Sequence, residues 1–293
     1  MASFNYGSAS DKRYSLDLTT RVMANKQKTL ESYLVSTTAH KTSLTSYEAC
    51  PAETFLVYVC DAYDSYAHCL NKFTKKADGT YNKDSEDSLR QISCAILGTT
   101  MGHFETYQRF LFSGIVERST NFHAFDVEKF LKHFDKHCGG EVFVSPGRLL
   151  AFRELDAPVG FVFADSLSGW HNPRRVNAFF KAFGIAQDVF SGSEIADLEV
   201  LWQLRHSVVH TGAWLTVPDA KKVKRLTAWQ DKPIVFEATF VNAMARRLHK
   251  LVKAANTRLL SDCTTLLGAA PTAKAKASLK DFLLVKSPKA VWL

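Results

Sequence analysis

Long apolar stretches are missing from this sequence. The longest uninterrupted apolar run is near Phe55 to Cys60, far too short to cross a lipid bilayer. The first residues, MASFNYGSASDKRYS, also lack the charged and then apolar profile of a signal peptide. We therefore expect a cytoplasmic protein with no membrane partner.

Cysteines are few and irregularly spaced. The six, at positions 50, 60, 69, 94, 138 and 263, form no Cys-x-x-Cys pair and no regular framework. This spacing indicates buried or incidental thiols of a cytosolic protein, not a disulfide scaffold.

Familiar cofactor and catalytic motifs are absent as well. The chain has no phosphate-binding loop, dinucleotide fingerprint, nucleophile elbow or kinase signature. His133, His137 and Cys138 have the chemistry of metal ligands, but no second ligand pair has matching spacing. We favour a helix end before Gly139, where histidine complements the helix dipole. The sequence thus predicts no metal and no cofactor.

What is present is an ordinary globular composition, with 46% hydrophobic and 23% charged residues in a chain of 293. That length suffices for one large domain or two small ones. The apolar periodicity predicts helices at about 14–36, 51–74, 85–115, 125–137, 173–182, 193–211, 236–262 and 277–285. Stretches 141–150 and 157–170 contain Pro or Gly and short apolar runs, which indicate loops or isolated strands.

Residues 213–222 and 232–238 could pair as a short hairpin. The predicted fold class is therefore mainly α, a helical bundle with a short β-hairpin or strand insertion after the helix at 193–211.

That helix carries the clearest chemistry in the chain. Ser191 and Glu194 have capping-box spacing at its start, and Gly212 fits the position just past its end. On a helical wheel His206 and His210 stack one turn apart on a polar stripe with Glu199 and Gln203. Arg205 instead projects into the apolar face, which comprises Ile195, Leu198, Trp202 and Val209.

A guanidinium in an apolar face is costly unless an acceptor lies close or the face opens to a groove. Two interpretations of Arg205 stay open: its stem packs on the core while its head reaches water, or its head binds phosphate. The histidines could likewise be solvated residues of an exposed stripe. Acting together, the three would supply a base, a proton donor and a phosphate-binding cation, the parts needed to cut RNA without a metal.

The surrounding text, SEIADLEVLWQLRHSVVHTGAWLT, resembles the motif helix of the HEPN superfamily, most closely its RiboL-PSP-type branch. Members carry an arginine, a polar residue directly after it, and a histidine four to six positions after the arginine. Arg205, His206 and His210 match that pattern, and HFETYQRFLF, NPRRVNAFFKAFGI and AWLTV match further elements in order. The resemblance covers roughly residues 85 to 265. It divides the chain into a helical N-terminal region of unknown role (1–84), a HEPN-like helical domain (85–265), and a flexible link with a C-terminal tail (266–293).

The resemblance implies a metal-independent endoribonuclease that leaves 2′,3′-cyclic phosphate and 5′-hydroxyl ends. It also implies a homodimer in which the two motif helices face each other across a cleft. Arg205 would hold the phosphate, His210 would take or give the proton, and His206 would position the phosphate or share the proton transfer. Glu105 or His103 of the early helix could orient Arg205. Such proteins commonly act as toxins or antiphage effectors, with an antitoxin or another regulatory partner protein.

Positive charge follows the motif in the sequence. The net charge is +8, and the expected RNA-binding residues are Lys221, Lys222, Lys224, Arg225 and Arg246. Arg247, Lys250, Lys253 and Arg258 continue along the same closing helix. A solvated helix face and a charged loop would explain the same residues.

Two other functions stay open. One is a non-catalytic HEPN-type module that binds RNA, a nucleotide or a protein. The other is a structural helical adaptor, which predicts that Arg205 pairs inside the core with an acid such as Glu105 or Asp197.

Overall fold

A computed structural model describes residues 29–33, 43–123, 125–137, 146–153 and 157–293. The chain divides into two compact units, Met1–His40 and Lys41–Leu293. In the first unit the described residues hold one 3-10 turn, η2 (Leu30–Tyr33). The rest of the helix predicted at 14–36 lies outside the described residues.

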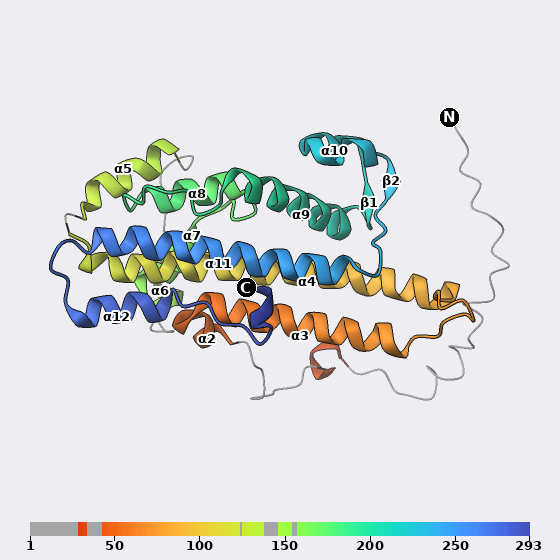
Figure 1. Ribbon diagram of the computed structural model, residues 1–293. Coiled ribbons are helices and arrows are strands. Elements are labelled where there is room, and N and C mark those ends of the chain that lie inside the picture. The colour runs from red at the N-terminus through yellow and green to blue at the C-terminus, as the bar shows by residue number, and fades with distance from the viewer. Residues whose placement is uncertain (1–28, 34–42, 124, 138–145, 154–156) are drawn as a thin grey trace. The chain divides into compact units, whose positions relative to one another are not determined.

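The second unit is built mainly of α-helices, as the periodicity predicted (Figure 1). Its helices are α2 (Leu44–Ala49), α3 (Pro51–Lys72), α4 (Lys83–Arg118), α5 (Val127–His137), α6 (Pro146–Arg153), α7 (Val159–Ser166), α8 (Pro173–Lys181), α9 (Gly192–His210), α10 (Val217–Lys222), α11 (Phe240–Leu266) and α12 (Ala273–Phe282). Short 3-10 turns η3 (Ser119–Asn121) and η4 (Lys224–Trp229) lie between helices, and η5 (Ala290–Trp292) follows α12. Strands β1 (Trp214–Leu215) and β2 (Lys232–Pro233) complete the unit.

Helix α4 is the centre of the packing. It begins at Asn82, whose side chain accepts a hydrogen bond from the Ser85 backbone N–H, and it runs for 36 residues. Helices α3, α7, α9 and α11 all pack against it. Phe104, Tyr107 and Phe112 are fully buried on its core faces, so aromatic side chains supply much of the apolar area that holds the bundle together.

The predicted short β-hairpin is present, but it is smaller than the two stretches that predicted it. Strands β1 and β2 are antiparallel, with Trp214 opposite Pro233 and Leu215 opposite Lys232. After β1 the chain turns into α10, because the Thr216 hydroxyl accepts a hydrogen bond from the Asp219 N–H and Pro218 occupies the first turn. The mainly α fold with a short hairpin is confirmed.

Two segments predicted as loops or strands contain helices, α6 and α7. Helix α7 packs closely on α4 at Gly160, where an added Cβ would lie 2.3 Å from the Ser113 carbonyl oxygen. The Gly160 N–H also donates to Glu117 at 2.6 Å. Tertiary packing on α4 thus decides this helix, which the local Pro and Gly pattern argued against.

The compact unit starts ahead of residue 85 and extends past residue 265. Helix α3 packs on α4 and α11, and α12 packs on both of the same two helices. Leu279, Phe282 and Leu283 are buried, and α12 begins at Ala273, within the stretch expected to be a flexible link. The chain on both sides of the predicted HEPN-like domain therefore contributes to one core.

Among the described residues, none of the helices combines the length and the apolar character needed to traverse a membrane. The five cysteines in this part of the chain are free thiols, and Cys60 and Cys263 are buried.

Candidate functional site

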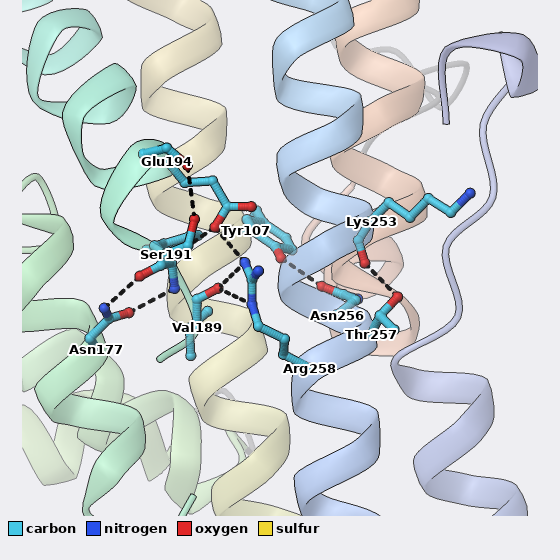
Figure 2. A network of polar contacts seen from close by, with 11 residues as sticks. Tyr107, Asn177, Val189, Ser191, Glu194, Lys253, Asn256, Thr257 and Arg258 are labelled. Carbon is cyan, nitrogen blue, oxygen red and sulfur yellow. Dashed lines mark hydrogen bonds and ion pairs between the residues drawn. The ribbon is translucent and has the colours of Figure 1, made fainter. Parts of the chain in front are cut away.

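Helix α9 is anchored at its start by polar contacts (Figure 2). The predicted capping box is present, and the Ser191 N–H donates to the Glu194 carboxylate at 2.6 Å. The same carboxylate binds Arg258 of α11, and both side chains are mostly buried. Arg258 also donates to the Val189 carbonyl oxygen at 2.8 Å and 3.2 Å. These contacts fix where α9 leaves the core and therefore where its far end lies.

The other end of α9 is closed by the loop that leads into the hairpin. The Ser207 carbonyl oxygen accepts hydrogen bonds from the N–H groups of Thr211 and Ala213, both at 3.1 Å. Gly212 and Ala213 have φ of 62° and 64°, the left-handed conformation that ends helices. Glycine at 212 was predicted for this place, and the backbone conformation gives the reason.

The faces of α9 differ from the helical wheel at two positions. Ile195, Leu198 and Trp202 are buried as predicted, but Val209 is 52% exposed although it lies on the apolar stripe. Gln203, on the predicted polar stripe, is buried and donates to the Ser207 hydroxyl at 3.4 Å. A wheel treats a helix as uniformly covered, whereas α4, α8 and α10 cover different parts of α9.

Arg205 lies half-buried near the end of α9. Its Nε is buried without a hydrogen-bond partner, and its guanidinium forms no ion pair with the described residues. A buried N–H of a cation without an acceptor is costly, so native proteins rarely retain one without a reason. A buried Nε on a half-buried arginine fits both interpretations from the sequence, a stem that packs on the core with its head at the surface and a head that binds phosphate.

The acids and the histidine proposed as partners of Arg205 make other contacts. Glu105 pairs with Arg109 at 2.7 Å, one turn along α4. His103 Nδ1 lies 2.9 Å from the Tyr47 hydroxyl, and its ring stacks on Tyr58 of α3, so it faces α2 and α3.

Asp197 binds Arg225 at 2.6 Å and Arg247 at 2.8 Å. The adaptor hypothesis predicted an acid such as Glu105 or Asp197 as the partner of Arg205, and for these two acids that prediction is wrong.

His206 and His210 lie together, as their spacing predicted. Their ring centroids are 4.7 Å apart, and the planes are tilted by 43°. His206 Nε2 is 3.9 Å from an Asp219 carboxylate oxygen. Burial lowers the pKa of His206, the Asp219 carboxylate partly opposes this, and the nearby His210, Lys222 and Arg205 lower it further. His206 is therefore predominantly neutral at pH 7.

Asp219 is the site residue that the sequence analysis missed. It is 6% exposed, and the hydrogen bond from Lys222, at 2.7 Å, is the main reason why its pKa is lowered. Its carboxylate stays ionised near neutral pH and lies 3.9 Å from His206 Nε2, close enough to interact electrostatically but beyond hydrogen-bond distance. The signal was present in the sequence: an acid three residues after Thr216, at the start of the short helix that follows the motif.

The predicted RNA-binding residues fall into two groups. Lys221, Lys224 and Arg246 are exposed and form no ion pair with the described residues. Lys222 and Arg225 are held by Asp219 and Asp197.

Arg247 reaches the same Asp197 from α11, so both basic segments return to the motif helix. Arg258 does not belong to this surface, because it lies in the mostly buried pair at the start of α9.

Little of the alternative metal cluster falls within the described side chains. His133 Nε2 lies 3.1 Å from the Ala178 carbonyl oxygen, which it binds as a donor. The side chain of His137 and all of Cys138 lie outside the described residues. Where side chains are described, no three His, Cys, Asp or Glu residues come together as a metal site.

An apolar pocket of about 1020 Å³ lies elsewhere in the unit. Phe130, Phe163 and Phe183 are among its walls, which come from the end of α4, from α5, α6 and α7, and from neighbouring loops. No residue of α9 or α10 lines it. This pocket is separate from the histidine pair.

The chain was compared with protein-family models, with curated proteins and with solved structures, and none of them matches it. The resemblance to HEPN ribonucleases stays a prediction from the residues of the motif and the order of the elements around it.

Proposed function

We propose that the protein is a metal-independent endoribonuclease whose catalytic residues are Arg205, His206 and His210. The observation that carries the proposal is the buried Arg205 Nε without a hydrogen-bond partner among the described residues, in the same last turns of α9 as the neighbouring His206 and His210 rings. Phosphate is the natural acceptor for such a group, since arginine binds its oxygens with two parallel hydrogen bonds.

The reaction needs one group that takes a proton and one that gives a proton. The RNA 2′-oxygen attacks the adjacent phosphorus, the bond from phosphorus to the 5′-oxygen breaks, and 2′,3′-cyclic phosphate and 5′-hydroxyl ends result. His206 is suited to accept the 2′-hydroxyl proton because its lowered pKa leaves it neutral. His210 gives a proton to the 5′-oxygen, and Arg205 stabilises the charge that develops on the phosphate.

The proposal includes a homodimer in which the ends of two α9 helices approach each other. Val209, half-exposed on the same turn as Arg205 and His206, offers apolar area for that contact. A symmetric pair would place Arg205 of one copy near the histidines of the other. We further propose a cytoplasmic toxin or antiphage role, held in check by an antitoxin or another regulatory partner protein.

The test is cleavage of a mixed RNA by the purified full chain in the presence of a chelator. We expect cutting with cyclic phosphate ends, and a loss of at least about 100-fold in rate in both Arg205→Ala and His210→Ala. His68→Ala, an exposed histidine of α3, is the matched control and should cut like the parent. A parent protein that cuts nothing, or cutting that survives both substitutions, contradicts the proposal.

The same assay addresses the alternative, a non-catalytic module. Exposed basic residues such as Lys221 and Arg246 would attract the RNA backbone without any chemistry. RNA that is bound but not cut from pH 5 to pH 8 would favour that function.

A further inference from the structure

We propose that Trp214 and Trp229 form a stacking platform for unpaired bases, so that the protein selects single-stranded RNA. As a substrate site this inference rests on the proposed function; as a binding site it stands alone. The chain has five tryptophans, and Trp170 and Trp202 are buried. Trp214 and Trp229 are 39% and 62% exposed; Trp214 begins strand β1, and Trp229 ends η4, between the two strands of the hairpin.

The hairpin region has a small core of its own, which does not include these two rings. Leu215, Ala220 and Leu226 are buried in a core of their own, which packs on Val200 and Leu204 of α9. Figure 1 shows α10, β1 and β2 gathered at one end of α9. The two exposed indole rings are therefore not part of the buried core of the hairpin region.

Each ring has a polar contact while remaining partly open to solvent. The Trp214 indole N–H donates to the Asp231 carboxylate at 3.1 Å. The Lys232 ammonium lies 5.7 Å from the centroid of the Trp229 ring, which places a cation next to an exposed aromatic face. The hydrogen bond restrains the Trp214 ring, so this ring loses less entropy when a base stacks on it.

The platform is tied to the proposed catalytic end of α9. The backbone N–H of Trp214 donates to the Thr211 carbonyl oxygen at 3.2 Å, and the Thr211 hydroxyl donates to the Trp214 carbonyl oxygen at 2.5 Å. Thr211 directly follows His210, the last residue of α9. A strand whose bases stack on the hairpin region would thus pass the histidine pair.

Charge identifies the occupant as a nucleic acid strand. Residues 201–250 contain nine lysines and arginines but only three acids, so this stretch carries most of the net charge of +8. Exposed aromatic rings interleaved with exposed cations are typical of single-strand binding, because every unpaired base offers a face for stacking. A duplex buries those faces and would use only the cations.

The test measures binding of a fluorescently labelled, non-cleavable 2′-O-methyl RNA of 12 nucleotides by the full chain. We expect Trp229→Leu to weaken binding at least about fivefold, and Trp229→Phe to retain most of it. Val235→Ala removes a half-exposed apolar side chain of the same hairpin region and should bind like the parent. A blunt duplex of the same sequence, and an abasic strand of the same charge, should bind the parent at least about fivefold more weakly than the single strand.

Equal binding by the parent and Trp229→Leu, or equal binding of the strand and its abasic counterpart, would overturn the platform. So would a solution dimer that Trp229→Leu converts to monomers with RNA binding unchanged, because the rings would then serve the contact between copies. His210→Ala separates the two proposals. If the parent cuts no RNA but His210→Ala and the parent both bind the strand in a Trp229-dependent way, the nuclease proposal fails and the platform stands.

Discussion

Replacing Arg205 by methionine separates a functional arginine from a structural one. Methionine keeps an unbranched apolar stem and removes the guanidinium. The buried Nε has no acceptor among the described residues, so its unsatisfied N–H destabilises the folded state. Methionine has no such N–H and removes this destabilisation. That penalty is about 1–3 kcal/mol for a buried donor. The rest of the half-buried guanidinium reaches solvent, so we expect Arg205→Met to raise the free energy of unfolding by only about 1 kcal/mol.

Urea unfolding followed by circular dichroism measures this change, and RNA cleavage is measured on the same samples. We expect greater stability together with a loss of at least about 100-fold in rate. Arg247→Met is the control: it removes an exposed pair with Asp197 and should cost at most about 1 kcal/mol without a comparable loss of rate. A decrease of more than about 1 kcal/mol in Arg205→Met would refute the reasoning, since an unpaired cation cannot stabilise the fold by that amount.

Three further predictions concern the scaffold of the site. Arg258→Met removes the ion pair with Glu194 and should lower the free energy of unfolding by about 2–3 kcal/mol. This is less than the loss for a fully buried pair, because Glu194 retains some exposure. A change below about 0.5 kcal/mol in equilibrium unfolding would contradict the prediction. Burial lowers the pKa of His249 from its usual 6.5, so the stability that its neutral form contributes is complete above pH 6.5 and is lost as the pH falls through the lowered pKa. His249→Gln has no such group and should therefore lose less stability than the parent between pH 7 and pH 5. Identical stability profiles of the two proteins over this pH range would count against the prediction. Gly160→Ala should destabilise the protein by about 1–3 kcal/mol, because the added Cβ meets a backbone carbonyl of α4. In its control, Gly98→Ala, nothing lies within 4 Å of the added Cβ, so this variant should stabilise α4 by up to about 1 kcal/mol. A higher melting temperature for Gly160→Ala than for Gly98→Ala would exclude the clash.

Local signals in the sequence were sufficient to predict much of the fold. Apolar periodicity predicted α3, α4, α5, α8, α9 and α11 close to their observed bounds. The capping box at Ser191 and the glycine at 212 located both ends of α9. These features depend on residues a few positions apart, which interact in the same way wherever the helix lies.

The proximity of His206 and His210 also followed from the sequence alone, because residues four apart on a helix share a face. The partial burial of Arg205 likewise followed from its position on the wheel.

Only the tertiary structure decided what surrounds those side chains. Asp197 binds arginines from two distant segments and is therefore not available to Arg205. Asp219 faces His206 because α10 folds back onto α9. Helix α7 forms because α4 provides a surface for it, and Val209 is exposed although it lies on the apolar stripe of α9. The sequence by itself determined the helices and the reactive motif, because these depend on residues a few positions apart. The packing decided which partners each side chain of the motif has, because contacts between distant segments depend on how the whole chain packs.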